Sequence, residues 1–401
     1  MTWHRMLASI PVYLWLLLLV LVPNLLLIAM SFFKASGGVT IYEFTFDNYS
    51  RALGSATLRL LIFKTSLTAL TAALLATLVA YPMAFLVSRY LGKYKYMVVL
   101  LVIVPLWVSV MIRAFAWRII LGESGVLNSF LVGTGILAEP SGAFLFTRWS
   151  VLLALTYVAI PFVFVTSFTA LERVPNSLIE SAQDNGASPW QTLRHVIWPL
   201  SRSGAAIGFS LAFLIAVGDY LTPTMVGGLN GTMVGMVIAS QFGLAGNWPY
   251  GSAMAICLMA TVVVILLIVT LITRTKGVID AVDSGATVTV HPRRTLLGRL
   301  AAHVTLVLGI ALPLLFLYLP LMIIAVFSFN DSTVQTLPLS GFTLNWYAEL
   351  WSNNGLKAAF WRTIQVGGLT VAVSILVAVP FAMIFHYVKL RGGSFLQGAI
   401  D

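Results

Sequence analysis

The stretch ESAQDNGASPWQTLRHVIWPLS, residues 180–201, is polar and lies between two long apolar runs of the chain. Just before it, Pro175 suits the first position of a helix, where its missing N–H costs nothing. A helix is therefore predicted over 175–185. Asn185 and Gly186 are expected to end it, because glycine adopts the left-handed conformation that a helix terminus needs.

A second helix is predicted over 189–198. Ser188 can cap it, Pro189 fits its first position, and Gln191 completes a Ser-x-x-Gln capping box. Pro199 is then expected to return the chain to the following apolar run. The stretch thus predicts two short helices joined by a tight turn and inserted between two apolar segments.

The composition indicates the solvent of this chain. It has 401 residues, of which 59% are hydrophobic and 9% are charged, and its mean hydropathy is +0.96. Soluble proteins carry about 25% charged residues, so most of this surface is expected to face lipid. The net charge of +10 does not indicate nucleic-acid binding, because the cations stand beside apolar segments. The sequence has no nucleotide-binding loop and no metal-ligand spacing, so we predict no cofactor and no catalytic residue in this chain.

Eight apolar runs are long enough to cross a bilayer, since a span needs about 20 mostly apolar residues. Lipid offers no hydrogen-bond partners, so each run is expected to form a helix. Arg89, Lys93 and Lys95 follow the second run, and Lys389 and Arg391 follow the eighth, which places the N-terminus in the cytoplasm. The predicted spans are 11–33, 61–88, 96–120, 149–171, 203–226, 251–273, 301–328 and 360–387.

An internal repeat divides the chain. FTFDNY at 44–49 matches FTLNWY at 342–347, and the same offset of 298 pairs Pro82 with Pro380. It also pairs Thr65 with Thr363. Proline inside an apolar helix is costly, so its repetition is informative.

We therefore predict a first unit of six spans (1–275), a polar cytoplasmic linker (276–299) and a second unit of two spans (300–401). The second copy stops early in its third span, either because the chain is a fragment or because the gene is truncated. Its two spans have few helix neighbours, so we expect it to be the less well packed unit.

The second predicted helix carries an apolar stripe on the cytoplasmic side. Exposed apolar patches mark docking sites, whereas an amphipathic hairpin could instead lie on the bilayer surface. The polar face offers only Arg194 and His195, which favours docking. The stripe consists of Trp190, Leu193, Val196 and Ile197.

The same stretch resembles the Glu-Ala-Ala…Gly…Ile-x-Leu-Pro motif of ABC importer permeases. The departures are Ser181 for Ala, Val196 for Ile and Trp198 for Leu. In that family the motif forms the helix that fits a cleft in the ATPase subunit. The resemblance implies an all-α polytopic transmembrane bundle of the type I importer permease fold. The coupling residues that it implies are Glu180, Ala182, Gly186, Val196, Trp198 and Pro199.

The resemblance extends over the chain. VPNLLLIAMSFF, VPLWVSVMIRAFAW and NWPYGSAMAI look like the first permease subunit of spermidine/putrescine importers, and LYLPLMIIAVFSFNDS resembles the start of its companion. This implies a bacterial inner-membrane protein whose solute is a polyamine. The implied partners are a dimer of ATP-binding subunits, which bind ATP and Mg, a solute-binding protein, a second permease subunit and membrane lipid, without nucleic acid.

The candidate solute pathway centres on Asp219, an acidic residue near the outer end of the fifth span, because intramembrane charge is costly and often functional. Tyr220 and Arg113 complete the candidate set. Alternatively, Asp219 forms a structural ion pair with Arg113 or Arg118, or faces solvent.

Two other functions are weighed against an ABC permease. A secondary transporter or channel can show repeats and broken helices, but it needs no cytoplasmic docking helix. A membrane enzyme would need a cluster of His, Asp or Glu in adjacent spans, and the sequence has none. The solute itself stays open, since relatives of this family carry polyamines, iron, thiamine, phosphonates or opines.

Overall fold

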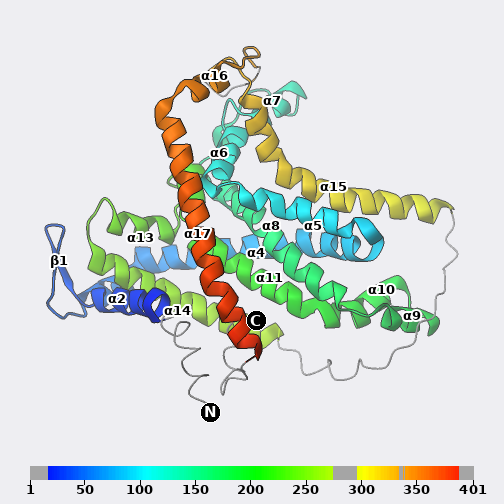
Figure 1. Cartoon of the computed structure of the whole chain (residues 1–401), viewed down its shortest axis with the longest axis horizontal. Coiled ribbons are helices and arrows are strands. Elements are labelled where there is room, and N and C mark those ends of the chain that lie inside the picture. Colours follow the sequence, from blue (N-terminus) through cyan, green and yellow to red (C-terminus); the bar gives the residue numbers. More distant parts are fainter. Residues whose placement is uncertain (1–16, 274–295, 334–336, 338, 388–401) are drawn as a thin grey trace.

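The computed structural model describes residues 17–273, 296–333, 337 and 339–387, and most of these residues are helical (Figure 1). Residues 1–16, most of the predicted linker 276–299 and the cations Lys389 and Arg391 lie outside the described part. The helices are α2 (Val22–Met30), α3 (Asp47–Gly54), α4 (Ala56–Tyr90), α5 (Lys95–Ile103), α6 (Val110–Leu121), α7 (Val126–Gly133), α8 (Arg148–Glu172), α9 (Asn176–Asp184), α10 (Pro189–Thr192), α11 (Trp198–Gly218), α12 (Leu221–Val226), α13 (Val234–Phe242), α14 (Trp248–Thr273), α15 (Leu296–Phe327), α16 (Asn345–Ser352) and α17 (Asn354–Tyr387).

The centre of the bundle is formed by α4, α8 and α11, which pack against one another. The interior face of α4 is built largely from alanines, which let neighbouring helices approach closely where lipid supplies no hydrophobic drive. Two glycines of α11, Gly204 and Gly208, meet α8 so closely that a Cβ on either would lie 2.3 Å from a side-chain atom of α8. The small residues of α4 and α11 therefore allow the close approach of the three central helices.

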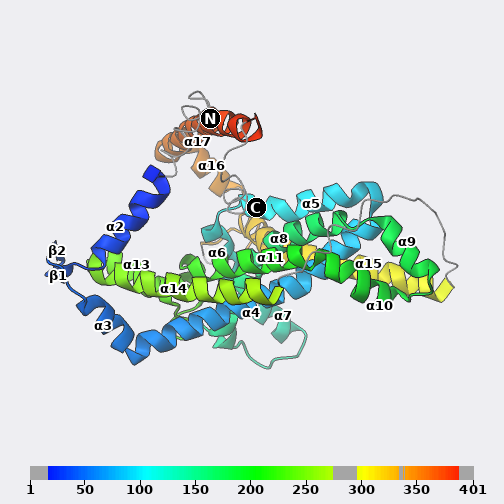
Figure 2. The same cartoon turned by 90° about the horizontal axis from the view of Figure 1, so that it is seen from below.

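Two short strands depart from the all-α expectation. β1 (Lys34–Ser36) and β2 (Val39–Ile41) pair in an antiparallel hairpin. Gly37 and Gly38 form its turn, and both have positive φ, 59° and 80°, which is why a Gly-Gly pair suits a two-residue hairpin. The hairpin lies at the opposite end of the bundle from α9 and α10 (Figure 2).

Six helices among the described residues are long and apolar enough to cross a membrane. They overlap the predicted second, fourth, fifth, sixth, seventh and eighth spans. Of the first predicted span, only a shorter apolar helix, Leu17–Met30, falls within the described part. The six long helices cover Ala56–Tyr90, Arg148–Glu172, Pro189–Gly218, Trp248–Thr273, Leu306–Phe327 and Asn354–Pro380.

The third predicted span is not one straight helix. The segments Gly92–Trp107 and Val110–Gly133 are bent by 90° at a short break. Pro105 lies just before the break, and Val108 is extended, with ψ of 135°. Proline removes a backbone donor and clashes with the preceding turn, so it breaks a run that hydropathy alone reads as continuous.

The internal repeat is confirmed as a repeated local structure. Phe32 stacks on Phe44 with ring centroids 5.1 Å apart, and Phe329 stacks on Phe342 at 5.4 Å. After each stack, a short helix and a long helix begin at equivalent positions, because α3 and α16, and likewise α4 and α17, start 298 residues apart.

The polar contacts of the repeat are shared as well. The hydroxyls of Ser31 and Tyr49 are hydrogen-bonded at 2.6 Å, and those of Ser328 and Tyr347 at 2.7 Å. The two copies therefore share this aromatic stack, this hydroxyl pair and the starts of their short and long helices.

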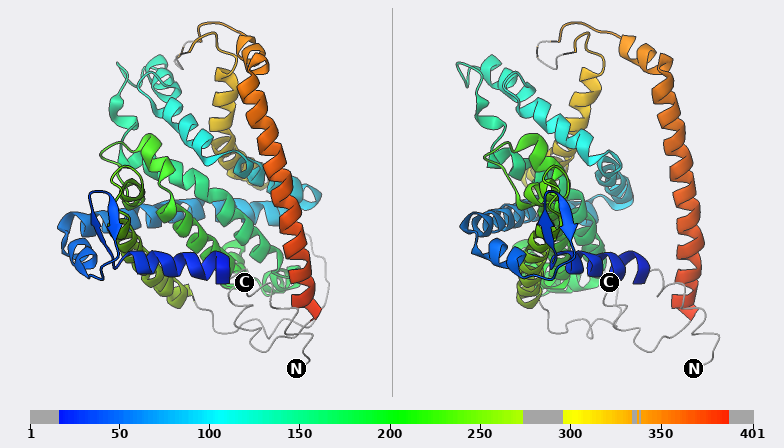
Figure 3. Two further views of the ribbon diagram at one scale, coloured as in Figure 1. Left: turned by 60° about the vertical axis from the view of Figure 1, so that its left-hand side comes forward. Right: turned by 90° about the vertical axis from the view of Figure 1, so that its left-hand side faces the viewer.

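The two helices of the second unit pack differently. α15 lies against α4, α5 and α6, and its Leu317 is fully buried. α17 stands clear of the bundle (Figure 3), and nearly all of its side chains up to Pro380 are exposed. The expectation that the second unit is the less well packed one is thus confirmed, most clearly for α17, although α15 packs against the first unit.

Candidate functional site

Residues 175–199, called here the 175–199 knob, project at one end of the bundle (Figure 1). Its first helix is α9, and Pro175 precedes it as the extended N-cap residue rather than as the first helical residue. Gly186 has φ of +82°, and its N–H donates to the carbonyl of Gln183 at 2.9 Å. The predicted glycine-terminated helix is therefore confirmed.

The second helix of the knob begins with the predicted capping box. The N–H of Ser188 donates to Oε1 of Gln191 at 2.7 Å, and the N–H of Gln191 donates to Oγ of Ser188 at 3.3 Å. Pro189 is the first helical residue. The backbone N–H groups of Ser188 and Gln191 at the start of this helix are thus both hydrogen-bonded.

Pro199 leads into the fifth span as expected, but the helix predicted over 189–198 does not end there. The helix runs without interruption from Pro189 to Gly218. The turn Leu193–Ile197 is a wider π-type turn just before Pro199, which accommodates the missing proline donor without ending the helix. The second helix of the knob and the fifth span are therefore one continuous helix.

The base of the knob is anchored by cations that the sequence analysis used only for topology. Arg89, at the end of α4, donates to the carbonyls of Leu171 at 2.6 Å and Val174 at 3.1 Å, and to Oδ1 of Asn176 at 2.8 Å. A cation near a helix C-terminus satisfies its last carbonyls. Lys95 forms an ion pair with Glu172 nearby.

The predicted apolar stripe of the knob is divided between two environments. Ile197 is buried, and Leu193 packs partly buried against the core. Trp190 points outward with 67% of its surface exposed. The stripe is thus not one exposed face, because its inner part attaches the knob and only its tip is available for docking.

The remaining coupling residues differ in exposure. Glu180 and Ala182 are half-buried on α9, Gly186 is exposed, and Val196 and Pro199 are half-buried. Trp198 packs edge-on against Tyr81 of α4, with ring centroids 5.1 Å apart. The large indole ring of Trp198, which stands where the family motif has leucine, makes this contact.

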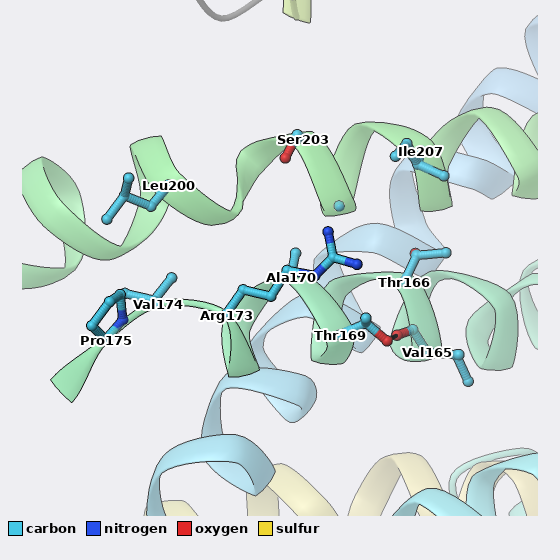
Figure 4. Close-up of a pocket in the computed structure, with 11 residues that line it drawn as sticks. Val165, Thr166, Thr169, Ala170, Arg173, Val174, Pro175, Leu200, Ser203 and Ile207 are labelled. Carbon is cyan, nitrogen blue, oxygen red and sulfur yellow. Dashed lines mark hydrogen bonds between the residues drawn. The ribbon is translucent and has the colours of Figure 1, made fainter. Parts of the chain in front are cut away.

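A pocket of about 440 Å³ opens between α8 and α11 beside the knob (Figure 4). Thr169 and Arg173 line it from α8 and its end, and Ser203 and Ile207 line it from α11. Pro175, the first residue of the knob, lies at one end of the pocket. A mixed polar and apolar space therefore adjoins the continuous helix.

The candidate pathway residues come together only in part. Asp219 caps α12, because its carboxylate accepts from the N–H of Thr222 at 3.0 Å and also from the Thr222 hydroxyl. In the described part of the chain it forms no ion pair with Arg113 or Arg118. The Asp-x-x-Thr spacing before a short helix was the signal that could have revealed this cap.

Arg113 and Tyr220 differ sharply in exposure. Arg113 is only 4% exposed and its Nε has no hydrogen-bond partner among the described residues, whereas Tyr220 is 46% exposed. α6, which carries Arg113, packs against α12, whose Thr222 N–H donates to the carboxylate of Asp219. The structure thus places Arg113 and Asp219 on neighbouring elements without a direct contact.

Comparisons with known proteins give the family. Residues 76–277 match the family described as "Binding-protein-dependent transport system inner membrane component". The spermidine/putrescine transport system permease protein PotB of Haemophilus influenzae is 35% identical over 259 residues, which cover 64% of this chain and 89% of that protein. PotB of Escherichia coli is 34% identical over 259 residues, which cover 92% of that protein.

The fold is also similar to that of a solved transporter. A chain from the crystal structure of a bacterial alginate ABC transporter, in complex with an alginate pentasaccharide-bound periplasmic protein, aligns with a TM-score of 0.50 at 20% identity. The alignment covers 68% of this chain and 94% of that one. This chain therefore belongs to the family of binding-protein-dependent transport system inner membrane components, as a multi-pass permease subunit of an ABC importer.

Proposed function

We propose that a dimer of ATP-binding subunits, which hold the ATP and Mg, drives this permease by binding the 175–199 knob on the cytoplasmic face. The observation that carries the proposal is the exposed tip of the knob, with Trp190 facing outward at the start of the helix that continues to Gly218. A large exposed aromatic side chain is costly in water and is typical of an interface anchor.

A cross-linking experiment tests this assignment. Cys257 is the only cysteine of the chain, so it is first replaced by serine. With Trp190→Cys, a bifunctional thiol reagent is expected to capture an ATP-hydrolysing subunit in membranes of the native host. Trp149→Cys is the control, because Trp149 is 77% exposed at the opposite end of α8.

Capture from position 149 instead of 190 would reverse the orientation and reject the docking role. Uptake driven by an ion gradient, with no ATPase captured from either position, would favour a secondary transporter.

ATP binding and hydrolysis then alternate the access of a central site between the two faces of the membrane. A solute-binding protein delivers the solute at the end opposite the knob, and a second permease subunit completes the pathway. The support is the family membership and the continuous helix that joins the knob to the outer end of the fifth span.

We infer that the solute is a polyamine such as spermidine or putrescine. The curated relatives PotB are permease proteins of spermidine/putrescine transport systems. Asp219 adds a carboxylate near the outer end of the fifth span, and a carboxylate suits a polyammonium solute because opposite charges attract strongly away from bulk water.

Asp219→Asn separates the charge of this residue from its structural role. Asparagine caps a helix about as well as aspartate, so α12 should remain intact. Loss of a charged hydrogen bond should raise the half-saturating spermidine concentration about tenfold. The measurement is uptake of labelled spermidine by cells without other polyamine importers. Unchanged half-saturation would exclude Asp219 from solute binding, and absence of any spermidine uptake by the wild type would reject the polyamine.

A further inference from the structure

The break in the third span leaves one half-buried carbonyl, that of Leu101, without its helical donor. In a continuous α-helix, the carbonyl of Leu101 would accept from the N–H of residue 105. Residue 105 is a proline, which has no N–H. The neighbouring N–H, that of Val104, already donates to the carbonyl of Leu100 and is not available to Leu101. A backbone carbonyl without a partner is destabilising within a membrane, because lipid offers no donor, so Leu101 needs a donor from elsewhere.

That donor comes from the second unit. The hydroxyl of Tyr318 on α15 donates to the carbonyl of Leu101 at 2.9 Å. The two groups are 217 residues apart in the sequence, so no local turn explains their contact. Tyr318 therefore supplies the hydrogen bond that Pro105 removes.

α15 also holds the arm beyond the break. Phe316 lies against Trp117 of α6, with ring centroids 5.4 Å apart, and against Tyr157 of α8 at 5.9 Å. Trp117 and Tyr157 are themselves in edge contact at 5.7 Å. Aromatic contacts of this kind contribute beyond their buried area. One segment of α15, 316–318, thus contacts both arms of the bent span.

We propose that α15 fixes the bend of the third span, with Tyr318 as the positioning residue, so that the second unit sets the shape of the transport pathway in the first. Intramembrane helices broken by proline need partners for the freed backbone groups, and neighbouring helices commonly supply them. Through α15, the second unit then contributes to the shape and transport function of the first unit, even though α17 makes few contacts.

A distance measurement across the bend tests this directly. Spin labels are placed at Met97→Cys on α5 and Phe115→Cys on α6, both of them exposed, in the Cys257→Ser background. At 1.5 Å per residue, arms of 11 and 7 residues would separate the two positions by about 20 Å at a right angle and about 27 Å if straight. Tyr318→Phe is expected to add a population at longer distance and to lower uptake about fivefold at equal membrane abundance.

A second variant tests whether the effect of Tyr318→Phe depends on the missing N–H of Pro105. Pro105→Ala returns an N–H to position 105, so Leu101 regains a donor within its own helix. In that background, Tyr318→Phe should change neither the distance distribution nor the uptake further. If Tyr318→Phe alone fails to accumulate, adding Pro105→Ala should restore its abundance.

Tyr347→Phe is the matched control, because it removes a hydroxyl hydrogen bond of the same unit far from the break. An unchanged distance distribution in Tyr318→Phe would overturn the proposal. Equal effects of Tyr318→Phe with and without Pro105→Ala would overturn it as well, and so would a double variant as scarce as the single one.

Discussion

Gly208→Val is expected to force α11 away from α8 and to lower the stability of the whole bundle. A Cβ at position 208 would lie 2.3 Å from Oγ1 of Thr166 and 2.8 Å from the Cα of Val163. The second of these is backbone, which cannot rotate aside, so a helix must move. Overpacking of this kind costs about 3 kcal/mol at the upper end of its usual range.

The stability loss is measured as the thermal unfolding midpoint of the detergent-solubilised protein. A loss of about 3 kcal/mol corresponds to a fall of roughly 4 °C for a chain of 401 residues. Gly218→Val is the matched control on the same helix, because a Cβ there has no atom within 4 Å. Equal midpoints for the two variants would show that the close approach of α8 and α11 is not what stabilises the bundle.

Gly186→Val is expected to abolish uptake while the protein stays in the membrane. Gly186 has φ of +82°, which costs a β-branched residue about 1–3 kcal/mol, and no atom lies within 4 Å of its Cβ position. The strain should therefore distort the turn between α9 and α10 without disturbing the core. We expect ATP hydrolysis in proteoliposomes with the ATPase to continue and uptake to fall at least about tenfold.

Gly54→Val is its control, because position 54 is equally open but its φ is not positive. It should leave uptake and hydrolysis unchanged, since it adds bulk without backbone strain. Normal uptake by Gly186→Val would reject the role of the turn in coupling. A parallel loss in Gly54→Val would show that added bulk alone is harmful.

The local structure of the knob was predictable because its signals act over three or four residues. Ser188 and Gln191 cap each other as their spacing predicts, and Gly186 takes the left-handed conformation that ends α9. The hydropathy of the long runs likewise located the six helices that can cross a membrane. The role of the knob in coupling stays a prediction.

The two misread prolines show where local reasoning ends. The helix predicted over 189–198 continues through Pro199, whereas Pro105 breaks the apolar run 96–120 that was predicted as one span. The difference depends on what lies around each proline, a wider turn before Pro199 and a hydroxyl from α15 beside Pro105. Such long-range compensation has no signature in the surrounding sequence.

The polar partners of the site were equally hard to foresee. Asp219 was weighed as a partner for solute or for an arginine, but its carboxylate caps the next helix. Arg89 was counted as a topology signal, yet it binds the carbonyls at the base of the knob, 82 and 85 residues away. Charge and hydropathy located these residues, and only the tertiary structure assigned their contacts.

The unbroken helix from Pro189 to Gly218 has a mechanical consequence. Its 30 residues make a rod about 45 Å long, and a hydrogen-bonded rod resists compression along its axis. The π-type turn Leu193–Ile197 and Pro199 are the places where this helix can bend, so force applied near Trp190 reaches the fifth span through that segment. Asp219 lies immediately beyond the far end of the helix, so a tilt of the fifth span moves its carboxylate.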